Sequence, residues 1–222
     1  RLGKPIYQIQ SSKSHIRRVM ISAEKLVELY RQACDIELQA FKPGNVSIYA
    51  EGHDMTVNDF RMSAEVSAEP LCNPAYTLGE KIFYAVKATR DAVGCNTNLG
   101  IILLCAPIIQ AASHTAQDKQ LRPAIVQVLA STTIRDAEWV FKAIALASPG
   151  GLGESDEQDV HQPPTVTLTQ AMQIAADKDR IAQQYSSGYK DIFDFAVFRY
   201  NAKLSQWRDR SWAAVFVYAE IL

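Results

Sequence analysis

Helix-start signals recur along this chain, and they constrain its fold more than any other feature of the sequence. Residues 77–80 (Thr-Leu-Gly-Glu) and 167–170 (Thr-Leu-Thr-Gln) have the spacing of a capping box, in which the first and fourth side chains bond to free backbone amides at a helix start. Strand-like alternation is confined to residues 45–50 and 165–169, and no Asn-Gly or Asp-Gly hairpin turn occurs. The sequence therefore predicts an all-α protein, a single compact multi-helix domain with functional interhelical loops.

The same signals set the boundaries of the expected helices. Ser22 and Thr56 can cap the first two, Pro123 suits a first helical turn, and the periodicity of the first helix places Glu37 on its apolar stripe with Leu26, Tyr30, Ala33 and Phe41. We expect a basic N-terminal arm at residues 1–20 and one helical catalytic domain at residues 21–222. A fifth helix is expected to start at residues 122–123, and the others cover residues 22–41, 56–70, 77–93, 99–112, 133–147, 167–185, 191–207 and 211–222.

Charge and composition narrow the class of partner. The net charge of the 222 residues is −1, so no global field attracts nucleic acid or an anionic membrane, and neither is expected as a partner. The longest apolar run, residues 99–112, is shorter than the ~20 residues that cross a bilayer. With no secretory signal at the start and four cysteines without metal-ligand spacing, we expect a cytoplasmic protein with reduced thiols, which could form a homodimer.

One candidate site surrounds Lys42-Pro43-Gly44-Asn45. Glu37 precedes it on the apolar stripe, where a carboxylate either pairs with Lys42 or an arginine or coordinates a cation, because burying it alone is costly. Asp54 follows the same loop. Glu37 and Asp54 could together bind Mg²⁺, which takes one or two carboxylates plus substrate phosphates.

A second candidate is the polar turn from Gly94 to Gly100. Gly94 can end a helix in the left-handed conformation, and Asn96, Thr97 and Asn98 can cap the next one. The start of a helix attracts anions, because its first amides are unpaired and its dipole is positive there. The turn is therefore either a phosphate-binding loop or a capped connection with no further role.

Two later segments offer further candidates. Asp177 shares a helical face with Ile174 and Ile181, and it either pairs locally with Arg180 or binds a metal or ribose, with Arg180 as a phosphate clamp. Residues 148–153 (Ser-Pro-Gly-Gly-Leu-Gly) are rich in glycine but lack the Gly-Lys-Ser/Thr of a Walker motif. They suit either a phosphate loop or a hinge.

Taken in order, these motifs resemble those of the triphosphoribosyl-dephospho-CoA synthase family (ATP:dephospho-CoA triphosphoribosyltransferases). The resemblance covers roughly residues 22 to 185, and residues 148–153 and 163–165 are similar to a branch associated with tetrahydromethanopterin-linked one-carbon metabolism. The motifs are Glu37, Lys42-Pro43-Gly44-Asn45-Val46, His53-Asp54-Met55, Phe60, Ser63-Ala64 and Gly94-Cys95-Asn96-Thr97-Asn98-Leu99-Gly100.

The resemblance implies an all-helical, Mg²⁺-assisted transferase. ATP would release adenine, and its triphosphoribosyl unit would move to the 2′-hydroxyl of dephospho-CoA or a related acceptor. The carboxylates assigned to catalysis and metal binding are Glu37, Asp54 and Asp177. The residues assigned to the nucleotide and its phosphates are Lys42, Gly44, Asn45, Asn96, Thr97, Asn98, Gly100 and Arg180.

Two charged residues of the family pattern are missing. Leu99 stands where the family has a lysine, in a turn that typically continues His-Lys-Gly and is here Asn98-Leu99-Gly100, and Ser47 stands where the family has an aspartate. These losses keep alternatives open: a non-catalytic nucleotide- or cofactor-binding homologue, a metal-dependent hydrolase of a nucleotide or ribosyl bond, or a purely structural helical module.

Overall fold

The protein consists of helices joined by loops in the part that the computed structural model describes, which is residues 21–43, 45–49, 55–115, 120–147 and 159–221. No strand occurs among these residues, so the predicted all-α fold is confirmed. The predicted N-terminal arm, residues 1–20, lies outside them. The helices are α1 (Ala23–Gln39), α2 (Val57–Cys72), α3 (Leu78–Val93), α4 (Leu99–His114), α5 (Leu121–Ala130), α6 (Ile134–Ala147), α7 (Leu168–Ala175), α8 (Arg180–Ser187), the π-helix η2 (Asp191–Ala196), α9 (Val197–Trp207) and α10 (Arg210–Ile221).

The predicted caps begin and end these helices. Thr56, Thr77 and Thr167 each form a complete capping box, and the Ser22 hydroxyl accepts a hydrogen bond from the Lys25 amide at 3.2 Å. Gly94 ends α3 with a φ of +73°, a left-handed conformation that costs glycine little. Local sequence therefore fixes most helix boundaries.

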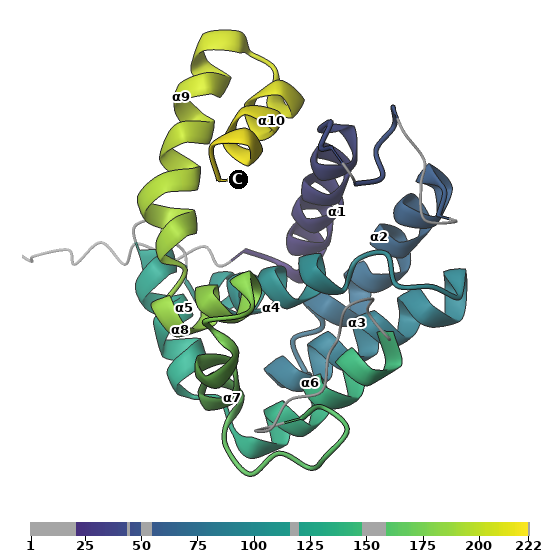
Figure 1. Cartoon of the computed structure of the whole chain (residues 1–222), viewed down its shortest axis with the longest axis vertical. Helices are drawn as coiled ribbons and strands as arrows, with labels where there is room; N and C mark the ends of the chain where they lie inside the picture. The colour runs from purple at the N-terminus through teal and green to yellow at the C-terminus, as the bar shows by residue number, and fades with distance from the viewer. Residues whose placement is uncertain (1–20, 44, 50–54, 116–119, 148–158, 222) are drawn as a thin grey trace, which may run out of the picture.

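Helix α4 runs through the middle of the molecule (Figure 1). It packs against α1, α2 and α3 on one side and against α5 and α8 on the other. Its apolar sequence follows from this position, because a helix surrounded by others has no polar face. Ile102 and Ala106 are fully buried there. None of the helices in the described part of the chain is long and apolar enough to cross a membrane.

Helices α3 and α6 approach each other closely at Gly79. A Cβ atom at this position would lie 2.7 Å from the Asp136 backbone, so only glycine fits. The buried Asp136 carboxylate accepts hydrogen bonds from the Gly79 amide (3.0 Å) and from the amide and hydroxyl of Thr133 (2.9 and 2.7 Å). This carboxylate therefore joins two helices and caps one of them.

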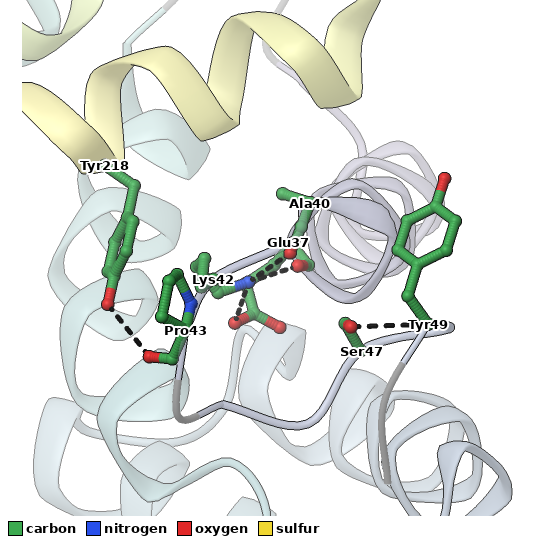
Figure 2. Close-up of polar contacts among 7 residues, drawn as sticks. All are labelled: Glu37, Ala40, Lys42, Pro43, Ser47, Tyr49 and Tyr218. Atoms are coloured by element: carbon green, nitrogen blue, oxygen red, sulfur yellow. Dashed lines mark hydrogen bonds and ion pairs between the residues drawn. The ribbon is translucent and has the colours of Figure 1, made fainter.

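The C-terminal helices form a hairpin that projects from the rest of the molecule (Figure 1). α9 and α10 pack against each other, and α10 also packs against α1. Ser211 of α10 donates a hydrogen bond to the Gln39 side chain (3.2 Å), and the Tyr218 hydroxyl donates one to the Pro43 carbonyl (3.4 Å; Figure 2). The hairpin thus supports the end of α1 and the loop after it.

Two predictions about the helices are wrong. In α1 the buried stripe is Leu26, Tyr30, Cys34 and Leu38, whereas Ala33 and Phe41 are exposed and Glu37 is half-buried. The expected helix from 167 to 185 is two helices, α7 and α8. Asp179 separates them, because its side chain caps α8 by accepting the Ala182 amide at 2.7 Å.

Candidate functional site

Residues from the two best-defined sequence motifs line one pocket. It has a volume of about 310 Å³ and lies where the end of α1, the start of α2 and the start of α4 meet. The structure thus brings together Glu37, Asn45, Thr97, Asn98 and Gly100, which are up to 63 positions apart in sequence (100 − 37). The remaining lining residues, which the sequence reasoning did not assign to a site, are Val46, Met55, Phe60 and Ile101.

Glu37 and Lys42 form an ion pair at one wall of this pocket, in which Lys42 is buried and Glu37 is half-buried. Lys42 is 7% exposed, and its ammonium group lies 2.9 Å from Glu37 Oε1 (Figure 2). The same group donates hydrogen bonds to the carbonyls of Glu37 (2.5 Å) and Ala40 (3.1 Å). Two roles were predicted for Glu37, pairing with Lys42 or an arginine and coordination of a cation. The ion pair with Lys42 is the one observed. Lys42 also caps the C-terminus of α1, where a cation is favoured by the dipole.

The loop after Lys42 is fixed by backbone contacts. The Asn45 amide donates to the Lys42 carbonyl at 3.0 Å, and the Ile48 amide donates to the Leu38 carbonyl at 3.1 Å. Ser47 is fully buried between them, and its hydroxyl accepts the Tyr49 amide at 3.3 Å (Figure 2). These bonds hold the loop against the end of α1, so that Asn45 reaches the pocket.

The start of α4 supplies unpaired backbone donors. The Asn96 side chain accepts the Leu99 amide at 3.2 Å, as a cap should, but Asn98 makes no side-chain cap. The first internal backbone bond of the helix is from the Ile102 amide. The amides of Gly100 and Ile101 consequently have no partner within the helix, and both residues line the pocket. This is the geometry that binds phosphate or carboxylate groups.

Buried hydroxyl groups from α1 and α2 hold the polar turn in place. The Asn98 side-chain nitrogen donates to Ser67 at 3.2 Å, and Ser67 is 2.9 Å from the Tyr30 hydroxyl. Thr97 donates to Ser63 at 2.6 Å. The sequence reasoning missed the role of Tyr30 and Ser67. The available signal was the spacing of the two serines, four residues apart on one face of a helix, where a polar residue needs a partner if it is buried.

Asp177 and Arg180 are not among the residues that line this pocket. Asp177 is exposed in the turn between α7 and α8, so its predicted position on a helical face with Ile174 and Ile181 is wrong. Arg180 begins α8, is exposed, and pairs with Asp191 at 3.7 Å instead of with Asp177. The roles assigned to them in metal and phosphate binding remain predictions.

A cluster of metal ligands is not present in the described part of the chain. No group of three or more His, Cys, Asp or Glu side chains there could hold an ion, and Glu37 is the only carboxylate among the described residues that line the pocket. The predicted site residues Gly44 and Asp54, like the glycine-rich segment 148–153, lie outside the described residues. The Mg²⁺ site therefore stays a prediction.

An apolar groove adjoins the pocket. Its volume is about 470 Å³, and it lies between α1 and the helices η2, α9 and α10. Glu37 lines both cavities, and Lys42 lines the groove. The other lining residues are Ala33, Ile36, Ala40, Ile192, Ala196, Val197, Tyr200, Ala214, Val217, Tyr218 and Ile221. The Glu37 carboxylate thus lies at the boundary between a polar and an apolar cavity.

Comparison with known families decides what kind of protein carries this site. The family model CitG, described as ATP:dephospho-CoA triphosphoribosyl transferase, matches residues 23–222. The chain belongs to this family. The match extends beyond the motifs in the first half of the chain and includes the C-terminal hairpin. Neither the curated proteins nor the solved structures contained a significant match.

The structure shows where the two positions lie at which the chain lacks a charged residue of the family pattern. Leu99 is 8% exposed and packs in the hydrophobic core, and Ser47 is fully buried. Neither position directs a charged group into the pocket in this CitG-family protein. The described lining residues include no lysine or arginine, so an anion would meet only uncharged donors among them, such as the backbone amides at the start of α4.

Proposed function

We propose that this CitG-family protein transfers the triphosphoribosyl unit of ATP to the 2′-hydroxyl of dephospho-CoA or a related acceptor, with release of adenine. The observation that carries the proposal is the pocket itself. The family model covers residues 23–222, and the motif residues that suggested the family converge around unpaired amides at the start of a long helix. Phosphate binding at such a position follows from the helix dipole and the free N–H groups.

The donor nucleotide would lie with a phosphate at the start of α4. The amides of Gly100 and Ile101 would bind phosphate oxygens, and Thr97 would add a hydroxyl whose own proton goes to Ser63. A Cβ built on Gly100 would lie 3.2 Å from Ile181 Cδ1, so a glycine here lets α8 pack closely beside the start of α4.

The residues present fit one Mg²⁺ ion only together with the nucleotide. Glu37 offers a carboxylate and Asn45 an amide oxygen, and both are oxygen ligands of the kind that Mg²⁺ takes in addition to substrate phosphates. When bound, the ion supplies positive charge against the triphosphate. The protein's own cation, Lys42, is already paired with Glu37.

The reaction requires the protein mainly to position the two substrates and to stabilise the charge that develops between them. The C1′–N9 bond of ATP breaks, a bond forms between C1′ and the acceptor oxygen, and the proton lost by the hydroxyl balances the one that adenine gains. Positive charge develops at C1′ in such a reaction, as it does in glycoside hydrolysis. The Glu37 carboxylate, at the edge of the pocket, would stabilise that charge and accept the hydroxyl proton.

The apolar groove would hold the part of the acceptor that is not a nucleotide. Two substrates need two adjoining binding sites, and Glu37 lines both the pocket and the groove. Ala214→Trp would fill the groove. We expect it to raise the KM for the acceptor about tenfold or more while leaving ATP binding within twofold.

Adenine release is the direct test. Purified protein with ATP and Mg²⁺ is assayed by chromatography with and without dephospho-CoA, and the expected result is adenine only when the acceptor is present. Glu37→Gln should lower the rate at least 100-fold. Glu28→Gln, which removes the exposed Lys25–Glu28 ion pair on the same helix, is the matched control and should change nothing. No adenine with any acceptor would overturn the proposal, and ribose triphosphate formed without acceptor would indicate a hydrolase.

A second function is favoured by one observation. The buried Leu99 and Ser47 leave the described lining of the pocket without the cation and the second carboxylate of the family pattern. This arrangement supports a homologue that binds a nucleotide without turning it over. Calorimetry that detects MgATP binding weakened by Asn96→Ala, combined with no adenine release, would select this function over the first.

A further inference from the structure

The hydrogen bonds behind the pocket can be assigned one direction that satisfies the Ser63 carbonyl, Ser67, Tyr30 and Asn98 together. Ser67 Oγ donates its single proton to the Ser63 carbonyl at 2.6 Å. Ser67 therefore accepts from both of its other neighbours, the Tyr30 hydroxyl at 2.9 Å and the Asn98 side-chain nitrogen at 3.2 Å. Burial raises the pKa of Tyr30 far above its ordinary value, so this hydroxyl keeps its proton and remains a donor.

This order of protons fixes the orientation of the Asn98 amide. An asparagine side chain can present either its nitrogen or its oxygen to a given neighbour, and the neighbour decides which. Ser67 has no proton left to give, so Asn98 must turn its nitrogen inward. Asn98 is 5% exposed and lines the pocket. With its nitrogen bonded to Ser67, the carbonyl oxygen is the half of the amide that is left to bind a ligand.

We propose that Tyr30 is a positioning residue for the CitG-family site, acting through Ser67 to hold the Asn98 carbonyl oxygen toward the ligand. Tyr30 is 3% exposed and does not line the pocket, so its influence passes through the side chains in between. The proposed role of the oxygen is to accept a hydrogen bond from a hydroxyl group of the nucleotide's ribose. This part rests on the proposed function, whereas the orientation of Asn98 does not.

Tyr185 provides a matched control. Its buried hydroxyl donates to the Leu103 carbonyl of α4 at 2.7 Å, and it is 2% exposed. Tyr185→Phe therefore removes a buried tyrosine hydrogen bond to α4 itself, and Tyr30→Phe removes one to Ser67 of α2. Only Tyr30 is connected to Asn98, through Ser67. A general loss of packing would affect both variants, whereas positioning would affect one.

The first measurement needs no ligand. Hydrogen exchange of the Asn98 side-chain amide and of the backbone amides at residues 97–101 is followed by NMR in the whole protein. We expect exchange about five to ten times faster in Tyr30→Phe and within twofold of wild type in Tyr185→Phe. Equal acceleration in both variants, or in neither, would overturn the positioning role.

The second measurement uses MgATP as the probe. We expect Asn98→Ala to weaken its affinity about tenfold and Tyr30→Phe about fivefold, with no further loss when the two changes are combined, because Tyr30 acts through Asn98. Additive losses would overturn the proposal. If wild type binds no MgATP while the exchange rates behave as expected, the proposed function fails and the positioning of Asn98 stands.

Discussion

Two junctions between helices contain buried polar groups, and they differ in whether any hydrogen-bonding capacity is left over. At the α3–α6 junction, the Asp136 carboxylate accepts from the Gly79 amide and from the amide and hydroxyl of Thr133. At the α1–α2–α4 junction, Tyr30, Ser67 and Asn98 are bonded in series. There the series ends at a pocket in which the first amides of α4 remain free.

The difference separates structural polar groups from those that can bind a ligand. A junction whose donors and acceptors all meet one another gains stability and cohesion but offers nothing to a ligand. A junction that leaves helix-start amides unpaired makes the ligand-free protein less stable, but it can bind an anion. Substitutions at the first should therefore change unfolding, and substitutions at the second should change binding.

The largest expected effect on stability is at Gly79. Gly79→Ala would place a methyl group 2.7 Å from the Asp136 backbone, and we expect the free energy of unfolding to fall by about 3 kcal/mol, measured by urea denaturation. Gly100→Ala is the comparison at the other junction. Its methyl would meet only the end of the Ile181 side chain at 3.2 Å, and it should cost under about 1 kcal/mol while weakening MgATP binding. Equal losses of stability would remove the distinction between the junctions.

Replacing one carboxylate at the α3–α6 junction and one at the pocket tests the same comparison. Asp136→Asn leaves one acceptor oxygen where two served, and we expect about 2 kcal/mol lower stability with unchanged affinity for MgATP. Glu37→Gln keeps the stability within about 1 kcal/mol, because the Lys42 ammonium retains the carbonyls of Glu37 and Ala40 as partners. Denaturation and calorimetry on the same samples check both. A change in MgATP affinity in Asp136→Asn would contradict the structural role.

A smaller effect is expected at Gly94, which ends α3 on the way to the pocket. Gly94→Ala introduces a side chain at a φ of +73°, although no atom lies within 4 Å of the new Cβ. The cost is therefore conformational, about 1 kcal/mol, and Gly94→Asn should cost less because asparagine tolerates this conformation better. Thermal unfolding of the two variants gives the order. Gly94→Asn as damaging as Gly94→Ala would argue against a purely conformational cost.

The smallest effect is an alkaline loss of stability from thiols beside the α1–α2 junction. Burial raises the pKa of Cys34 and of Cys72 to about 11, from about 9 when exposed. The folded state then binds more protons than the unfolded state between these values. The contribution is complete below pH 9 and is lost as the pH rises toward 11. Urea unfolding at pH 7, 9 and 10.5 should show this decline in the free energy of unfolding. With each protein referred to its own value at pH 7, we expect the decline to be smaller in Cys34→Ala than in the wild type, by about 1 kcal/mol or less.

Sequence patterns predicted the helices well where their ends are set locally. The capping boxes at Thr77 and Thr167 and the left-handed Gly94 are confirmed, because each depends on residues within four positions. The prediction of a single helix from 167 to 185 is wrong, because a local cap starts a second helix within this range. The apolar spacing continues through Asp177, but Asp179 caps a new helix, and periodicity alone does not distinguish a helical aspartate from a capping one.

The candidate site could be predicted only as a set of separate motifs. Glu37, Asn45 and the 96–100 turn were identified from residue type and spacing, and their meeting at one pocket is seen only in the structure. Tyr30 and Ser67 were missed, since nothing near them in sequence shows that Ser67 bonds to Asn98, 31 positions away (98 − 67), or that Tyr30 bonds to Ser67, 37 positions away (67 − 30).

By itself, the sequence determined where most helices begin and end and which family pattern the loops follow, because caps, turns and motifs depend on neighbouring residues. Tertiary structure decided which polar groups are satisfied and which stay open. That outcome depends on α1, α2 and α4 packing together, which turns Asn98 toward Ser67 and places Gly100 and Ile101, whose amides have no partner within α4, at the lining of a pocket. Hydrogen bonding is short-ranged and directional, so only contacts across helices could settle it.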